Sequence, residues 1–242
     1  MRALEPTIFY YEPLDAEVYI SPRLNARRFT ARWRNGRVLL SAPRYASERE
    51  ALSVLDNLAS SLKGMRPAPL YAHGAVMRFD NGEIHIDTQT NIPGRIISDC
   101  EFDDGRYKIT IGLPPDADPS APDIARLVSR LICERAKWLA HLMLIPQAKL
   151  VAERIGQHPT AWGISSGLRI LGRCDRRGII SLSYALIFAP TDIREFVICH
   201  ELAHLREMNH SPRFHEILEE YCGGREKDYT RRLKAVKWPF VK

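Results

Sequence analysis

Three residues of the sequence have the types and the spacing of a metal-dependent hydrolase: His200, Glu201 and His204. On a helix, residues four apart lie on one face, about one turn from each other, so both imidazoles can reach one metal ion. Glu201 lies beside that face, where a general base for the hydrolytic water belongs. His210 would supply a third nitrogen and leave one position of a tetrahedral zinc open, which is the catalytic arrangement rather than the structural one.

His210 can join this site only if the helix ends after His204. Six residues of continuous helix would turn His210 about 240° away from the metal. Asn209 tolerates the left-handed conformation that ends helices, and the Ser-Pro pair at 211–212 is typical of a new helix start. We therefore predict two helices with His210 at the break between them, the second helix being closed by the glycine pair at 223–224.

The motif is short, so the alternative is two surface histidines on an amphipathic helix beside a polar cap. The third histidine and the apolar lead-in at 196–199 favour a metal site. Cys174 and Cys222 are alternative zinc ligands, disfavoured because three histidines suffice. The oxyanion of amide hydrolysis needs a further donor. The candidates for this or for substrate contact are Tyr184, Arg173, His215 and Tyr221; the sequence does not choose among them, and each has an alternative packing or surface role.

The composition is that of a soluble globular protein. The chain has 242 residues, 45% of them hydrophobic and 26% charged, which is enough for one large or two small domains. No run of eighteen apolar residues occurs and the N-terminus has no secretory pattern, so we expect neither a membrane span nor export. The five cysteines form no C-x-x-C pair, which indicates reduced thiols in a cytoplasmic protein.

The net charge is +6, and much of it comes from arginine clusters. Such clusters can bind a nucleic acid or an acidic protein. The alternative is solvated strand and helix faces, which we favour because no nucleic-acid-binding motif accompanies the charge. The clustered residues are Arg23, Arg27, Arg28, Arg32, Arg34 and Arg37, then Arg173, Arg176 and Arg177, and near the C-terminus Arg225, Lys227, Arg231, Arg232, Lys234 and Lys237.

The first half of the chain has β patterning, and the whole predicts an α+β fold. Asn-Gly or Asp-Gly pairs at 35–36, 81–82 and 104–105 lie between alternating apolar and polar residues, a hairpin signal. Ser47 with Glu50 predicts a capping box that starts one helix. The proline-rich stretch 114–119 is the expected linker, so residues 1–117 form a β-rich N-terminal region and 118–242 a catalytic domain. The sequence shows no internal repeat.

The second half is mainly helical. The apolar spacing predicts a long helix over 124–142, a shorter one over 147–155, and extended chain over 160–187. The motif helix is expected to begin near Thr191, with two more helices after it. This order is similar to that of zincin proteases. The strand at 179–184 is then expected to be the sheet edge beside the metal, where an extended peptide can add by main-chain hydrogen bonds.

Residues 188–214 resemble the YgjP-like metallopeptidases and, more distantly, SprT-type and Wss-type proteases. The resemblance is carried by the His-Glu-Leu-Ala-His-Leu run at 200–205, the Met-Asn-His-Ser run at 208–211, and Phe214. It implies a zincin-like domain with zinc held by His200, His204 and His210 and with Glu201 as the base. The chain has Leu-Gly-Arg-Cys at 171–174 where the family commonly has Trp-Gly-Ser-Cys, and His215 where it commonly has tryptophan, so substrate specificity is not transferred.

The expected function is therefore zinc-dependent hydrolysis of a peptide or protein substrate. One alternative is a metal-dependent hydrolase of a phosphoanhydride or another non-peptide bond, with arginines holding phosphate. The other is a metal-containing module that binds nucleic acid or a partner through its basic sheet. Substitution of Glu201 distinguishes the enzymes from the binding module.

Overall fold

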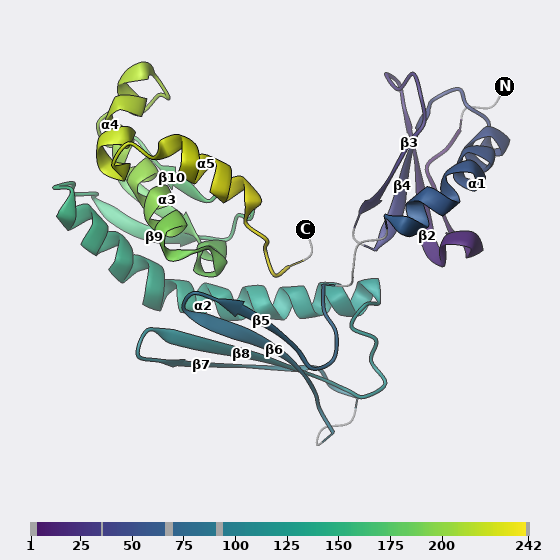
Figure 1. The fold of residues 1–242 in the computed structure, drawn as a ribbon, viewed down its shortest axis with the longest axis horizontal. Coiled ribbons are helices and arrows are strands. Elements are labelled where there is room, and N and C mark those ends of the chain that lie inside the picture. Colours follow the sequence, from purple (N-terminus) through teal and green to yellow (C-terminus); the bar gives the residue numbers. More distant parts are fainter. Residues whose placement is uncertain (1–3, 35, 66–69, 91–93, 241–242) are drawn as a thin grey trace. The chain divides into compact units, whose positions relative to one another are not determined.

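A computed structural model describes residues 4–34, 36–65, 70–90 and 94–240. Its elements, shown in Figure 1, form two compact units. The first unit comprises Met1–Leu70 with Asp118–Ala125, and the second comprises Tyr71–Ala117 with Arg126–Lys242. Strands predominate before residue 114 and helices predominate after residue 121, so the predicted α+β fold is confirmed.

The first unit is a four-stranded sheet with one helix packed on it. The strand order is β1-β2-β4-β3, with the central pair β2 and β4 parallel and both outer pairs antiparallel. The elements are β1 (Thr7–Tyr11), η1 (Glu12–Leu14), β2 (Ala16–Arg23), β3 (Thr30–Arg34), β4 (Arg37–Pro43) and α1 (Glu48–Gly64). The predicted capping box is confirmed, because Ser47 and Glu50 bond each other's backbone N–H.

The core of this unit lies between the sheet and α1. Val18 and Leu40 from the two central strands are fully buried, as is Leu55 from the helix. The indole N–H of Trp33 donates to the carbonyl of Leu62 at 2.7 Å, which fastens β3 to the end of α1. Alternate residues of each strand therefore face the helix, and the others face away from it.

The second sheet repeats this arrangement. Its order is β5-β6-β8-β7, again with a parallel central pair and antiparallel outer pairs, and a helix again follows. The elements are β5 (Ala75–Phe79), β6 (Gly82–Thr88), β7 (Ile97–Asp103), β8 (Arg106–Leu113) and α2 (Pro122–Arg154). The expectation of no internal repeat is thus wrong for the structure. Two sheets can share a strand order when their strands alternate apolar and polar residues in the same way, even if the residues differ. The structural repeat is therefore hard to detect by comparing the two segments of sequence.

The predicted hairpins are present, but one turn differs. Asp104 and Gly105 both have positive φ, 43° and 72°, as a two-residue turn of this type needs. In the hairpin of β5 and β6 the loop residues are Asp80 and Asn81, and Gly82 already belongs to β6. A Cβ on Gly82 would lie 2.3 Å from the carbonyl oxygen of Tyr107, so this glycine permits close strand approach rather than a turn. Asn35 of the first predicted turn lies outside the described residues.

The long helix α2 covers both predicted helices of this region in 33 residues, with Pro146 inside it. The expected break is absent because apolar residues stay buried on both sides of the exposed proline. Arg135 of α2 donates to the carbonyl of Ser98 in β7 at 2.7 Å. Most of the helix thus belongs with the second sheet (Figure 1). The second sheet and the C-terminal helices lie in one unit, whereas the sequence predicted a division after residue 117. Among the described helices, none combines the length and the apolar character needed to cross a membrane.

A three-stranded sheet and three helices complete the second unit. The strand order is β10-β11-β9. The elements are β9 (Ala161–Ser165), β10 (Gly172–Cys174), β11 (Ile179–Ser183), η2 (Tyr184–Phe188), α3 (Thr191–Ala203), α4 (Pro212–Cys222) and α5 (Glu226–Ala235). The predicted edge strand at 179–184 is wrong, because β11 is central: it pairs antiparallel with β10 and parallel with β9. The strand that contacts α3 at the sheet edge is β10.

The motif helix α3 is fixed at its beginning by the second sheet. The backbone N–H of Thr191 donates to the carboxylate of Asp80 at 2.7 Å, and the buried Arg194 bonds Asn81. The rings of Phe79 and Phe188 lie 5.1 Å apart between centroids. These contacts anchor the helix, so its other end holds the histidines in a defined position.

Candidate metal centre

The predicted helix end between His204 and His210 is confirmed. Helix α3 ends at Ala203, and the N–H of Leu205 bonds the carbonyl of Leu202 in a tightened last turn. The predicted left-handed Asn209 is wrong, because among the described non-glycine residues only Asp15 and Asp104 have positive φ. A tightened turn followed by an irregular segment reverses the chain instead.

The start of the next helix is as predicted. Ser211 is the N-cap of α4, its hydroxyl accepting from the N–H of Phe214 at 3.3 Å, and Pro212 occupies the first helical position. Gly223 ends the helix with φ 64°. His210 therefore lies in the short segment between two helices whose ends are both fixed.

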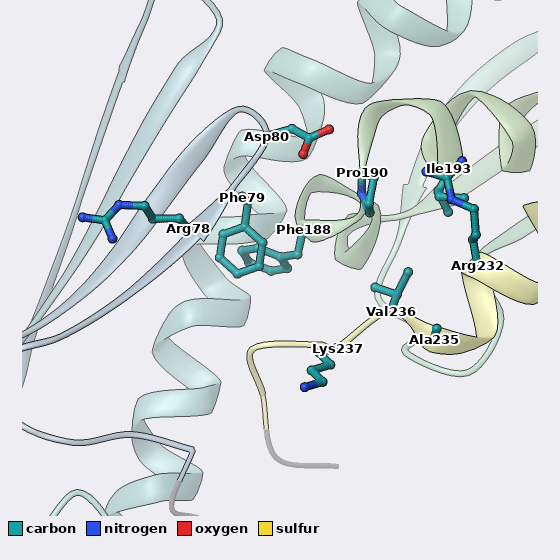
Figure 2. Close-up of a pocket in the computed structure, with 10 residues that line it drawn as sticks. All are labelled: Arg78, Phe79, Asp80, Phe188, Pro190, Ile193, Arg232, Ala235, Val236 and Lys237. Carbon is teal, nitrogen blue, oxygen red and sulfur yellow. The ribbon is translucent and has the colours of Figure 1, made fainter.

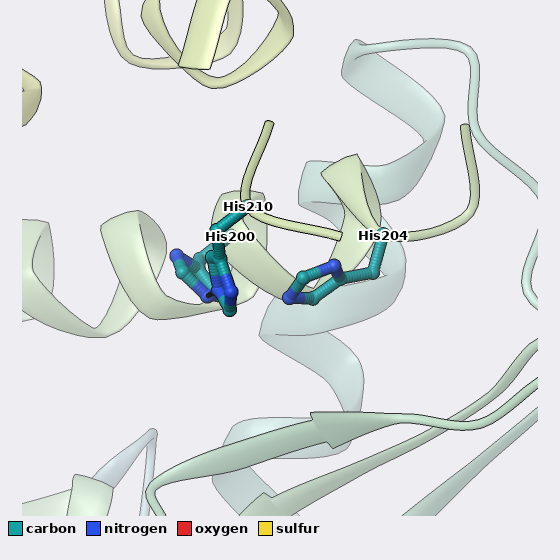
Figure 3. A group of neighbouring side chains, drawn as sticks. All are labelled: His200, His204 and His210. Carbon is teal, nitrogen blue, oxygen red and sulfur yellow. Dashed lines mark hydrogen bonds between the residues drawn. The ribbon is translucent and has the colours of Figure 1, made fainter. Parts of the chain in front are cut away.

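This chain path brings the three histidines together (Figure 3). One ligand atom from each of His200, His204 and His210 lies within 4.8 Å of the other two. The Nε2 atoms of His200 and His210 are 3.1 Å apart. Two nitrogens bound tetrahedrally at zinc distances would be about 3.4 Å apart. The donor set therefore fits a tetrahedral metal ion with an open fourth position.

The second nitrogen of His204 is already engaged. Its Nδ1 lies 3.1 Å from the carbonyl oxygen of Glu207, in the turn after α3. Since a carbonyl only accepts, Nδ1 carries the proton there and Nε2 is left for a metal, an arrangement common among metal-binding histidines. Burial lowers the pKa of His200 to about 4 and also lowers that of His204, so both rings are neutral near pH 7, as metal binding requires.

Phe214 forms the support of the three rings. Its side chain is fully buried, and its ring centroid lies 4.9 Å from that of His200, 4.6 Å from that of His204 and 4.8 Å from that of His210. In the sequence, Phe214 stands out only as part of a family motif. Its role follows from α4, whose first turn places this side chain under the histidines.

Glu201 lies on the side of α3 that faces β10. It is only 4% exposed, and burial raises its pKa to about 7, although a hydrogen bond from the backbone N–H of Cys174 acts against this. A Cβ on Gly172 would lie 2.4 Å from its Oε1. The carboxyl group therefore fills the space that the missing side chain of Gly172 leaves. Neither contact is visible in the sequence, because both join segments almost thirty residues apart.

Two of the four candidate contact residues lie away from the histidines. Tyr184 is buried against α2, where Cys133 bonds it and the Lys137 ammonium lies 5.7 Å from its ring centroid. Arg173 is exposed, and side chains alternate along a strand, so it points to the opposite face of β10 from Gly172.

The other two candidates belong to α4. His215 directly follows the supporting Phe214, their ring centroids are 5.5 Å apart, and its Nδ1 lies 2.8 Å from Glu226. Tyr221 lies in the last turn of α4, and its backbone carbonyl faces the thiol of Cys199 at 3.9 Å. Of the four, His215 lies near the histidine cluster, because it is among the groups that act electrostatically on His200.

A cavity of about 430 Å³ lies at the opposite end of α3 (Figure 2). Phe79, Phe188 and Ile193 form its apolar lining, with Arg78 and Lys237 among the charged residues around it. Ile193 is seven residues before His200, about 10 Å along the helix. None of the predicted site residues lines this cavity, so it is separate from the histidine cluster.

The chain matches a known family over most of its length. The family model described as YgjP-like, metallopeptidase domain, matches residues 27–235. Neither the curated proteins nor the solved structures contain a significant match. The matched range includes all three histidines, Glu201, Gly172 and Phe214.

Proposed function

Because the chain belongs to the YgjP-like metallopeptidase family, we propose that it is a zinc-dependent peptidase whose zinc is held by His200, His204 and His210. The observation that carries the proposal is the convergence of three imidazoles on one point beside a buried carboxyl group. Three nitrogen ligands without a carboxylate suit zinc better than iron or magnesium. A bound zinc ion would supply Lewis acidity to the attacking water and to the scissile carbonyl.

Glu201 is the proposed general base. A buried carboxyl group with a pKa near neutrality can accept a proton from the attacking water and deliver it to the leaving amine. Gly172 and the N–H of Cys174 hold the carboxyl group beside the histidine cluster. These two residues therefore position the base.

Strand β10 is the proposed site for the substrate backbone. The N–H of Ser183 bonds the carbonyl of Leu171, and the N–H of Asp175 bonds the carbonyl of Ile179. Because bonded pairs alternate in an antiparallel ladder, the backbone groups of Gly172 then point away from β11. An extended peptide could pair with this edge and pass close to the open metal position.

His215 is the proposed donor to the oxyanion. Its Nδ1 faces Glu226, so its Nε2 remains free to meet a developing negative charge. Tyr221 is the second choice, while Tyr184 and Arg173 point elsewhere and receive no role. We further propose a cytoplasmic location, supported by the five cysteines, all of which are free thiols.

The test uses the zinc-loaded full chain, a peptide library analysed by mass spectrometry, and a set of nucleoside triphosphates. Glu201→Gln should keep its zinc and lose cleavage by about 10²-fold to 10⁴-fold, the usual contribution of a general base. Glu153→Gln, an exposed glutamate on α2, is the matched control and should cleave normally. Cleavage that survives Glu201→Gln contradicts the role of the base. Hydrolysis of nucleotides without any peptide cleavage contradicts the peptidase proposal.

A further inference from the structure

The first sheet differs from the second in a long segment whose charged residues are all arginines. Residues 18–47 contain seven arginines and not one lysine, aspartate or glutamate. Six of these arginines are exposed, and none of the six forms an ion pair with a described residue. They are Arg23, Arg27, Arg28, Arg32, Arg34 and Arg44, here called the arginine surface.

The strand topology makes these residues neighbours. Strand β3 is an edge of the sheet, and Arg32 and Arg34 lie on its face away from α1, because Ala31 and Trp33 pack into the core. Arg27 and Arg28 lie just before β3. Since β2 and β4 are parallel and β3 runs against β4, Arg23 and Arg44 lie at the same end of the sheet as the start of β3. The arginine surface is therefore continuous along one edge and one end.

The second sheet shows that the fold does not need arginine there. The last residue pair before the turn can be compared between the two hairpins. In the first sheet this pair is Arg34 with Arg37, and in the second sheet it is Asp103 with Arg106. By the same comparison, Arg32 corresponds to Glu101, and all four of these β3 and β7 side chains are exposed. The same scaffold thus carries acids at the positions where the first sheet carries arginines.

The Arg34–Arg37 pair also has an energetic meaning. Like charges directly opposite each other destabilise a sheet, whereas opposite charges contribute favourably. The second sheet has the favourable pair, Asp103 with Arg106, and the first sheet has two arginines in register. Arg37 is paired with Glu17 at 2.6 Å, so Arg34 is the member of this pair without an acidic partner among the described residues. An anionic ligand would supply that partner.

The other basic clusters of the sequence are partly paired with acids. Arg177 pairs with Asp175 at 3.1 Å, Arg231 with Asp228 at 2.5 Å, and Arg232 with Asp192 at 2.5 Å. The charges of these three arginines are compensated within the chain. The arginine surface differs, because none of its six guanidinium groups has an ion pair with a described residue.

We propose that the arginine surface binds a single-stranded nucleic acid. Guanidinium groups bind phosphate through paired hydrogen bonds, and six of them along one edge can follow a phosphate backbone. Tyr45, next to Arg44, is 73% exposed and presents a ring on which a base can stack. Aromatic rings combined with a positive track are characteristic of single-strand binding. This inference is independent of the proposed peptidase chemistry.

The experiment transplants the charges of the second sheet into the first. The variant Arg32→Glu/Arg34→Asp in the full chain should fold normally, with a Tm equal to or above that of the wild type, because it restores the opposite-charge pair. Its affinity for a fluorescent oligodeoxythymidine of about 20 nucleotides, measured by anisotropy, should fall about tenfold or more. The slope of log K against log salt should become shallower by about 0.7 for each lost phosphate contact.

The matched control is Arg130→Glu/Arg176→Asp, which makes the same charge change at two exposed arginines of the second unit. This control should bind the oligonucleotide within about twofold of the wild type. Tyr45→Ser should weaken binding about fivefold or more, since one stacked base is lost. Equal weakening in the control, or unchanged binding by the β3 variant, overturns the proposal. So does arginine-dependent binding to phosphatidylserine and phosphatidylcholine vesicles without any binding of the oligonucleotide.

Discussion

The side chain of Glu201 occupies the space that a side chain at Gly172 would need: a Cβ on Gly172 would lie 2.4 Å from Oε1 and 2.6 Å from Cγ of Glu201. No real Cβ tolerates such distances, so either the strand or the glutamate must move if a side chain is added. A displacement of about 1 Å at a catalytic group can cost about 10²-fold in rate. The role of Glu201 therefore depends on the residue type at a distant position of β10.

Gly172→Ala should lower kcat about 10²-fold while the protein keeps its zinc, because the three ligands lie elsewhere on α3 and after it. Peptide-cleavage kinetics and metal analysis on the same preparation measure this. Gly167→Ala is the control, since its Cβ would meet nothing closer than 3.6 Å. Full activity in Gly172→Ala would mean that the contact does not position Glu201.

The local parts of the site could be predicted from the sequence. Helix capping and side-chain spacing act within a few residues, so the end of α3, the start of α4 at Ser211 and the convergence of the three histidines followed from residue types. The way in which the chain reverses before His210 could not be predicted. A helix can end either in a tightened last turn or at a left-handed residue such as Asn209, and the sequence does not distinguish the two.

Long-range features could not be predicted in the same way. Whether a strand is central or at an edge depends on its neighbours, so the five residues of β11 gave no sign of their position. The apolar spacing predicted separate helices over 124–142 and 147–155, but burial of Leu144 and Ala148 on either side of Pro146 keeps the helix continuous. The pairing of Gly172 with Glu201 likewise arises only when β10 packs on α3.

Phe214→Ala should weaken both the fold and the metal site. Removing a fully buried ring typically costs about 3–5 kcal/mol of unfolding free energy, and here it also removes the support of three imidazoles. Urea unfolding and zinc titration measure the two effects. Phe214→Leu refills part of the space and should lie between the wild type and the alanine variant in both measurements. Unchanged zinc affinity in Phe214→Ala would show that the histidines hold their positions without it.

Asp175, in the turn between β10 and β11, should make the free energy of unfolding depend on pH. Its carboxylate accepts from the N–H of Ile179 and from Arg177, and these bonds lower its pKa below the ordinary 3.8. The folded pKa is depressed, so the stabilisation is present above about pH 4 and is lost as the pH falls through the folded value.

Asp175→Ala should therefore be less stable than the wild type at pH 7, and the difference should shrink at pH 3. Urea unfolding of the zinc-free proteins at both pH values measures it, which keeps loss of metal out of the comparison. Arg177→Ala tests the smaller contribution of the side chain and should show a weaker effect of the same sign, since the backbone bond from Ile179 remains. A difference that is constant between the two pH values would contradict the carboxylate's role.

His204→Ala should lose zinc without loss of the fold. The substitution removes a proposed metal ligand, so zinc affinity should fall by more than about 100-fold, because even partners of ligands contribute about 10-fold to 100-fold. His141→Ala, an exposed histidine of α2, should bind zinc as the wild type does. Circular dichroism should remain near that of the wild type, since the second sheet buries Ile84, Ile109 and Ile111 independently of the histidines. Global unfolding of His204→Ala, or of the wild type with a chelator, would make the site structural.

His215→Ala should lower kcat more than it raises KM, with zinc retained, if its ring stabilises charge that develops only in the transition state. The expected loss is about 10²-fold to 10³-fold, the range found for a single oxyanion donor. Arg173→Ala is the informative control, because its side chain points to the other face of β10 and should leave kcat unchanged. His215 also pairs with Glu226, so Glu226→Gln separates the ring's position from its chemistry: it should change kcat far less than His215→Ala. Equal losses in these two variants would indicate that His215 only fastens α4 to α5, and Tyr221 would then become the donor to test.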